Sequence, residues 1–165
     1  MNRLIYSIAL ISVATIIVSC NSGSGKRNLD GYVSVTKIVD GDTFWVDDGS
    51  KKGIKVRLIG VDSPETRRTG RKEIGYFGQE AKKFVTGLLS GRMVKLVFDV
   101  GKYDQYKRTL AYVYLEDGTF LNAELVKQGY AMVMTVPPNV KHAEMFLHLQ
   151  QEAREKNRGL WNHQE

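Results

Sequence analysis

Two short segments of the chain carry acidic side chains at spacings suited to a hard metal ion. Residues 40–43 read Asp-Gly-Asp-Thr, and residues 57–66 contain two further carboxylates. Carboxylate oxygens suit Ca²⁺ or Mg²⁺ and do not suit a thiophilic metal. If adjacent strands bring the two segments together, Asp42, Asp62 and Glu65 form one oxygen-rich site.

The acidic segments also have simpler interpretations. An isolated Asp-Gly pair is usually only a hairpin turn, and a proline after a small polar residue commonly opens a loop. A helix-loop-helix Ca²⁺ site built on Asp40, Asp42, Asp47 and Asp48 is excluded, because Phe44 stands where a third oxygen ligand is required. The combination of the two segments is therefore more informative than either alone.

The acidic segments are placed by short β-rich runs separated by turn residues. Runs over 32–39, 43–46 and 54–59 predict three consecutive antiparallel strands. The third run alternates apolar and basic residues, as a half-buried strand does. This alternation places Arg57 on the face turned away from the apolar layer.

The remaining elements complete a small barrel. Helical spacing over 80–89 predicts a helix, and strands follow at 93–98 and 110–115. We expect Asn122 to cap a short helix, and residues 137–139 to open a last helix. Five strands with a helix between the third and fourth indicate a β-barrel with helices (α+β), namely a five-stranded OB-fold Greek-key barrel with about three helices.

The first twenty residues differ from the rest of the chain. Their apolar stretch over 4–18 is shorter than the about 20 residues a spanning helix needs, which favours an export signal over a transmembrane anchor. Residues 17–20 resemble the bacterial lipobox, and Cys20 is the only cysteine, which excludes a catalytic thiol elsewhere. We predict a lipoprotein signal peptide at 1–19, and a lipidated cysteine with a flexible tether at 20–30. The protein is then exported and lipid-anchored to the membrane of the bacterial cell envelope, periplasmic or surface-facing.

The chain is basic, with 24 Lys and Arg against 18 Asp and Glu and a net charge of +6. This balance raises the local concentration of a polyanion, either nucleic acid or an anionic lipid surface. Four of the cations lie in the loop between Thr66 and Gly78; they are Arg67, Arg68, Arg71 and Lys72. The loop is suited to tracking a phosphate backbone, and the alternative is a solvated charge run.

Four segments together resemble the staphylococcal nuclease (thermonuclease) family. They are residues 40–43, 57–66, 106–112 and 159–161, and the resemblance runs through the intervening chain in order and with compatible spacing. It implies a staphylococcal-nuclease-like OB-fold domain at 31–163. It also implies a Ca²⁺-dependent nuclease that hydrolyses DNA and/or RNA to 3′-phosphate and 5′-hydroxyl products.

The resemblance assigns roles to the acidic residues. Asp42 and Asp62 match the carboxylate ligands of the family's Ca²⁺, and Ser63 matches the residue that contributes its backbone carbonyl. Glu65 matches the residue that holds or deprotonates the attacking water. Such a set is chemically reasonable, because a metal neutralises charge at phosphorus while a carboxylate orients water.

The resemblance also assigns the phosphate contacts. Arg57 and Arg108 match the two arginines that grip the scissile phosphate, and Tyr106 matches a phosphate-contacting tyrosine. Two positions depart from the family pattern: Gln105 stands where the archetype has a lysine, and Thr135 stands about where it has a tyrosine near the nucleotide. The departures concern nucleotide affinity and leave the chemical residues in place.

Two other functions compete with a nuclease acting outside the cytoplasm. One is a non-catalytic nucleic-acid-binding OB-fold module at the cell surface, and the other is an adhesin that holds anionic polymer on its basic face. All five matching acidic and arginine side chains are present, which favours the enzyme. The expected contacts are to phosphate, so they do not rank DNA against RNA. We expect the protein to be a monomer.

Overall fold

The computed structural model describes residues 31–66 and 75–162. The predicted signal peptide, Cys20 and the tether before residue 31 lie outside the described residues, so these predictions are untested. No helix in the described part of the chain is both long enough and apolar enough to cross a membrane.

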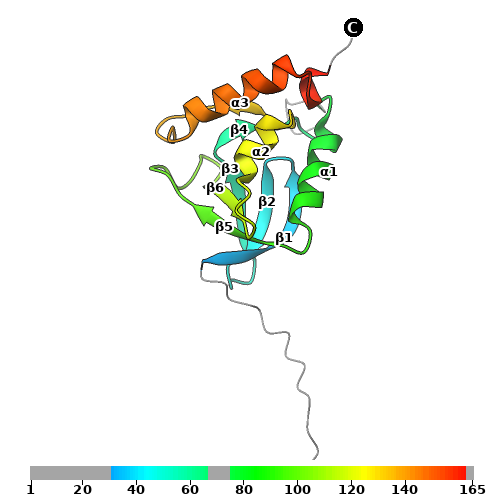
Figure 1. Ribbon diagram of the computed structural model, residues 1–165. Helices are drawn as coiled ribbons and strands as arrows, with labels where there is room; N and C mark the ends of the chain where they lie inside the picture. Colours follow the sequence, from blue (N-terminus) through cyan, green and yellow to red (C-terminus); the bar gives the residue numbers. More distant parts are fainter. Residues whose placement is uncertain (1–30, 67–74, 163–165) are drawn as a thin grey trace, which may run out of the picture.

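Five strands close into a barrel in the order β1-β2-β3-β6-β5 (Figure 1). The strands are β1 (Tyr32–Asp40), β2 (Thr43–Asp47), β3 (Ile54–Leu58), β5 (Met93–Val97) and β6 (Thr109–Leu115). The pair β3–β6 is parallel, and the other barrel pairs are antiparallel. The predicted OB-type barrel is confirmed, with strand ends within one or two residues of those expected.

The inside of the barrel is filled by the apolar residues that alternate along its strands. Phe44, Val46, Val56 and Val94 are completely buried, and Leu58 is 2% exposed. Burying each such side chain contributes about 1.5–3 kcal/mol relative to leaving it in water. This packing fixes the register of β2 and β3, and therefore the positions at which the acidic segments leave the barrel.

In the described residues, three helices pack around the barrel (Figure 1). They are α1 (Gly78–Leu89), α2 (Leu121–Lys127) and α3 (Ala143–Glu155), and a short 3₁₀ turn, η1 (Gly159–Trp161), ends the described chain. Helix α1 buries Ala81, Val85 and Leu89 on one stripe, the helical spacing that the sequence predicts. In Figure 1, α3 lies across one end of the barrel, with α2 beneath it.

Asn122 does not cap α2, contrary to expectation. It lies inside the helix, completely buried, and its amide donates to the Ile59 carbonyl at 2.9 Å and accepts from the Val113 amide at 3.0 Å. A buried amide side chain needs such partners. Asn122 thus joins α2 to the barrel, and Phe120 occupies the N-cap position.

A second, two-stranded sheet is absent from the sequence prediction. The expected third strand over 54–59 stops at Leu58, and the chain continues as β4 (Gly60–Asp62), which pairs antiparallel with β7 (Met132–Met134). Gly60 makes this change of direction possible. Its φ is +78°, and a Cβ there would lie 2.5 Å from the ring of Phe146.

The segment 137–139 does not open the last helix. Helix α3 starts only at Ala143. Asn139 is buried instead, and its amide side chain accepts from the Gly101 amide at 2.7 Å and donates to the Gly101 carbonyl at 2.8 Å. The segment therefore ties the β5–β6 connection to the chain that precedes α3.

Candidate active site

Arg57 is the centre of the acidic cluster. Its Nη2 lies 2.6 Å from Asp62 Oδ1, and its Nη1 lies 3.2 Å from Asp42 Oδ2. The same Nη1 donates to the carbonyl oxygens of Val61 at 2.7 Å and Leu58 at 3.2 Å. Arg57 is only 7% exposed, so its charge is held in place by oxygen atoms of two strands and a loop.

Asp42 joins the first hairpin to the loop after β4. It is 5% exposed, and its Oδ2 accepts a hydrogen bond from the Ser63 amide at 2.7 Å. Its Oδ1 accepts one from the Thr43 hydroxyl at 2.8 Å. Charge-assisted hydrogen bonds of this kind are roughly twice as strong as neutral ones. The two acidic segments are thus in direct contact, as predicted.

The cluster contains carboxylate oxygens, the donor type that a hard divalent cation prefers. Asp42 and Asp62 carry two negative charges, and Arg57 neutralises one of them, so one net negative charge remains on the cluster. In the described part of the chain, no group of three or more His, Cys, Asp or Glu residues is placed to hold a metal. A cation here therefore needs the Ser63 carbonyl or water to complete its oxygen shell, which is common for Ca²⁺.

Glu65 follows the cluster in a loop that is anchored on both sides. The hydroxyl of Thr66, the next residue, donates to Asp40 in the first hairpin, and the Gly75 amide donates to the Glu65 carbonyl at 2.9 Å. At the start of α1, Gly78 packs so closely that a Cβ would lie 2.4 Å from the Glu65 carbonyl oxygen. These contacts fix the backbone of Glu65 relative to the hairpin that bears Asp42.

Arg108 immediately precedes β6, the strand that pairs with the Arg57 strand. Its Nε lies 2.5 Å from Asp104 Oδ2, and its guanidinium carbon lies 5.4 Å from the centre of the Tyr106 ring. Partial burial raises the pKa of Asp104, but hydrogen bonds from Arg108 and Tyr106 outweigh this effect and lower it below its ordinary value. Asp104 therefore stays charged and orients Arg108. Tyr106 is 71% exposed beside it.

Comparison with known proteins decides the family. Residues 55–163, more than half of the chain, match the family described as staphylococcal nuclease homologue. The chain is also 39% identical over 162 residues to a thermonuclease of Staphylococcus intermedius, covering 93% of this chain and 94% of that protein. The chain belongs to the staphylococcal nuclease family. It is likewise 34% identical over 165 residues to a thermonuclease of Staphylococcus hyicus, covering 96% and 95% of the two chains. Identity to the endonuclease YncB of Bacillus subtilis is 36% over 141 residues, covering 83% of this chain and 65% of that protein.

Within this staphylococcal nuclease domain, direct contacts join four of the predicted site residues: Arg57, Asp42, Asp62 and Ser63. Glu65 is placed two residues further along the same loop. Arg108 lies immediately before the neighbouring strand β6 and forms its ion pair with Asp104, which is not a member of the acidic cluster. The roles that the resemblance implies for these residues remain predictions.

The family pattern did not reveal two residues that support the site. Asp104 precedes Arg108 by four residues, a spacing that indicates an ion pair only within a helix, and here it occurs in a loop. Thr66 bonds Asp40, which lies 26 positions earlier in the chain. No local sequence signal identifies such a distant pair.

The four cations of the predicted phosphate-tracking loop lie outside the described residues; they are Arg67, Arg68, Arg71 and Lys72. Gln105 and Thr135, the two departures from the family pattern, are both exposed. Substitution at either position therefore leaves the buried part of the domain intact.

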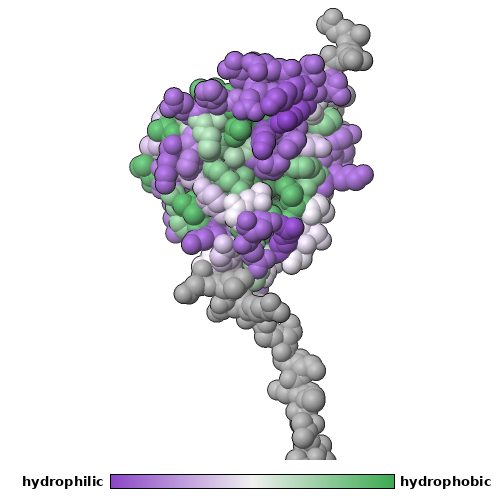
Figure 2. Space-filling view, viewed as in Figure 1, coloured by the Kyte–Doolittle hydropathy of each residue, from purple (hydrophilic) through white to green (hydrophobic). Residues whose placement is uncertain are grey.

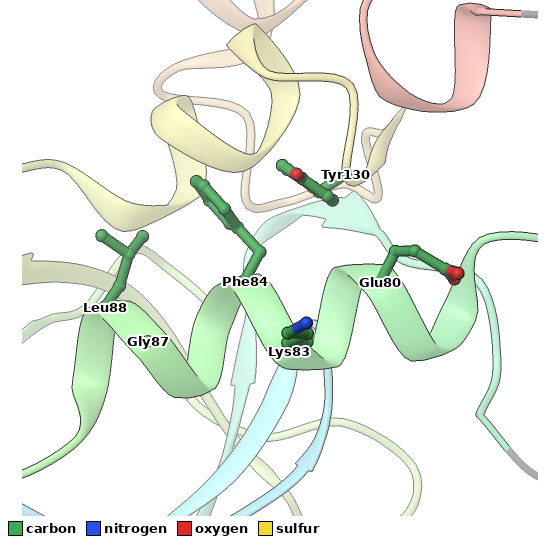
Figure 3. A pocket seen from close by; sticks show the side chains of 6 residues that line it. All are labelled: Glu80, Lys83, Phe84, Gly87, Leu88 and Tyr130. Carbon is green, nitrogen blue, oxygen red and sulfur yellow. The ribbon is translucent and has the colours of Figure 1, made fainter.

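An open pocket lies beside α1, where that helix faces Tyr130, a residue that follows α2 (Figure 3). It is lined by Glu80, Lys83, Phe84, Gly87, Leu88 and Tyr130. The rings of Phe84 and Tyr130 stack on each other with their centres 4.1 Å apart. No residue of the acidic cluster lines this pocket.

Proposed function

We propose that this protein is a Ca²⁺-dependent nuclease that hydrolyses DNA and/or RNA to 3′-phosphate and 5′-hydroxyl products. The observation that carries the proposal is the buried Arg57, shared between Asp42 and Asp62. A guanidinium group can bind a phosphate while a neighbouring pair of carboxylates binds a metal ion. Relatives named thermonuclease and endonuclease support the nuclease activity in this proposal.

In the proposed mechanism Asp42, Asp62 and the Ser63 carbonyl would hold a Ca²⁺ ion, and that ion would supply positive charge to the reacting phosphate. Arg57 and Arg108 bind the phosphate oxygens and stabilise the charge that develops on five-coordinate phosphorus. Glu65 orients a water molecule and accepts its proton as the water attacks phosphorus. The P–O bond to the leaving 5′ oxygen breaks on the opposite side, and that oxygen takes up a proton from solvent water.

We expect Ca²⁺ to support cleavage and Mg²⁺ to support little. Two carboxylates and a carbonyl make a site with few rigid ligands, which tolerates the larger ion, whereas Mg²⁺ demands a near-ideal octahedron. The measurement is cleavage of plasmid DNA and of RNA by the full-length protein in detergent, with Ca²⁺, with Mg²⁺ or with a chelator. Equal turnover with the two ions would contradict the Ca²⁺ assignment, and full activity in chelator would contradict a requirement for any metal ion.

The non-catalytic binding module remains the competing function. The same assay separates the two, because a binding module retains salt-dependent affinity for nucleic acid and leaves it uncut under every condition. The presence of Glu65 on the loop anchored next to the acidic cluster favours the enzyme, since binding alone requires no general base.

We also propose that the protein is exported and held at the membrane of the cell envelope by a lipid on Cys20. The support is the sequence of residues 4–20. Expressed in a bacterium, the parent should fractionate with membranes and Cys20→Ser should not, because the proposed lipid is attached through the Cys20 side chain. A Cys20→Ser protein that stays membrane-bound, with no lipid found on the parent by mass spectrometry, would refute the anchor. Monomeric state remains a prediction.

A further inference from the structure

Exposed aromatic side chains gather on the β5–β6 connection, next to Arg108. Phe98 is 43% exposed, Tyr103 is 61% exposed and Tyr106 is 71% exposed. Figure 2 shows hydrophobic side chains along the edge of the molecule where Figure 1 draws this connection. Three exposed rings in one short connection form an apolar patch, and exposed apolar patches often mark a binding site.

A lysine lies between two of these rings. Lys102 Nζ is 4.9 Å from the centre of the Phe98 ring and 5.7 Å from that of Tyr103. The attraction between the ammonium and the two ring faces holds the three side chains together. We call Phe98, Lys102 and Tyr103 the aromatic-lysine cluster. It combines a ring surface for a nucleobase with a positive charge for a phosphate.

The aromatic-lysine cluster is hydrogen-bonded to the chain around Arg108. The Leu110 amide donates to the Lys102 carbonyl at 2.8 Å, and the Asp104 amide donates to the Arg108 carbonyl at 3.2 Å. Tyr103 itself forms an antiparallel bridge with Thr109. The Tyr103 backbone is thus paired with the residue immediately after Arg108.

The connection that bears the cluster is fixed by hydrogen bonds to other parts of the domain. Asn139 clamps Gly101 through two hydrogen bonds, and Asp99 accepts one from the Tyr112 hydroxyl at 3.0 Å. Because these contacts fix the residues on either side of Val100, binding does not have to order the connection first. A preordered surface loses less entropy when a ligand binds.

We propose that the aromatic-lysine cluster is a binding subsite for an unpaired nucleotide next to the scissile phosphate. Tyr103 stacks on the base, Phe98 supports the arrangement, and Lys102 binds the phosphate of that nucleotide. Stacking requires a base face that a duplex does not offer, so this subsite favours single-stranded nucleic acid. The subsite rests on the proposed function for its orientation toward Arg108, while its own binding requires no cleavage.

The test measures affinity in chelator, where a metal-dependent enzyme cannot cut its ligand. Fluorescence anisotropy of the full-length protein in detergent compares three probes: a single-stranded oligonucleotide, a hairpin duplex, and an abasic backbone of the single strand's length. Tyr103→Ser should weaken single-strand binding by about tenfold and change abasic binding by less than about twofold. Tyr103→Phe should bind like the parent, because it keeps the ring.

Two further variants separate the contributions. Lys102→Met should weaken binding of the single strand and the abasic backbone alike, because it removes a phosphate contact. Leu147→Ser, at an exposed apolar residue of α3, should change neither affinity.

The outcome is independent of the nuclease assay. Unchanged single-strand affinity in Tyr103→Ser, or an equal loss on the abasic probe, would overturn the subsite even if the parent cleaves with Ca²⁺. Loss confined to the base-bearing strand supports the subsite even if the parent never cleaves, and the proposed function alone would then fail.

Discussion

Glu65→Gln should slow cleavage by about 10²- to 10⁴-fold, the contribution expected of a positioned general base. Glutamine keeps the size of the side chain and can still hold water by a hydrogen bond, but it cannot accept the proton. The backbone of residue 65 is fixed by Thr66 and Gly75, so the substitution should leave the loop in place. The measurement is single-turnover cleavage in Ca²⁺.

The affinity of Glu65→Gln for nucleic acid should be unchanged, in contrast to its cleavage rate. Affinity for nucleic acid depends on Arg57, Arg108 and the other cations, so Glu65→Gln should bind as tightly as the parent and lose affinity with salt in the same way. Glu80→Gln is the matched control, since Glu80 is exposed in the first turn of α1, and it should cleave at the parental rate. A Glu65→Gln protein that also cleaves at the parental rate would reject Glu65 as the base.

The sequence predicts the barrel well because its signals are local. Strand runs alternate with period two, Asp-Gly pairs mark the turns, and the α1 stripe repeats at helical spacing. The residue pattern does not predict the break at Gly60. The apolar run continues past this residue, but the chain changes direction there. That break depends on the ring of Phe146 in α3, a contact made 86 positions later in the chain.

Asn122 illustrates the second kind of error. Asparagine before an apolar helical run is a good N-cap in isolation. In the folded domain the same side chain is buried and forms hydrogen bonds with the carbonyl of Ile59 and the amide of Val113. The burial of these backbone groups outweighs the capping preference, and only the tertiary arrangement reveals it.

The candidate site was predictable in its residue types and not in its electrostatics. Two acidic segments on neighbouring strands predict convergence, and the contact from Ser63 to Asp42 agrees with that. Alternation along β3 predicts that Arg57 leaves the apolar layer, but it does not predict that Arg57 is buried. The burial follows from β4, the short strand that the periodicity does not reveal, whose Val61 carbonyl and Asp62 carboxylate cover the guanidinium.

Arg57→Met should lower the cleavage rate and the stability of the protein, and it should raise the affinity for Ca²⁺. Cleavage should fall by about 10²- to 10³-fold, as for the loss of one donor to a transition-state oxygen. Stability in chelator should fall by about 3 kcal/mol, the low end for breaking a buried ion pair, because Asp62 keeps 26% of its side chain exposed. Affinity for Ca²⁺ should rise by about tenfold or more, because a positive charge beside the metal ligands is removed.

The opposite signs make Arg57→Met a test of the site and not only of the fold. If Arg57 were merely structural, its loss would lower stability and activity together, and Ca²⁺ affinity would fall with them. If the carboxylates hold the metal, saturating Ca²⁺ should restore more stability to Arg57→Met than it adds to the parent, since the stabilisation by a ligand grows with the logarithm of its affinity for the folded state.

Thermal unfolding with and without Ca²⁺ measures the change in stability, and calorimetric Ca²⁺ titration measures the affinity. Arg92→Met is the matched control: Arg92 Nη1 lies 2.6 Å from Asp117 Oδ2, but the two side chains are 43% and 50% exposed. Its loss should therefore shift stability by less than about 1 kcal/mol and leave Ca²⁺ affinity unchanged. A Ca²⁺ affinity that is unaltered or weaker in Arg57→Met would show that Asp42 and Asp62 are partners of the arginine alone and do not form the metal site.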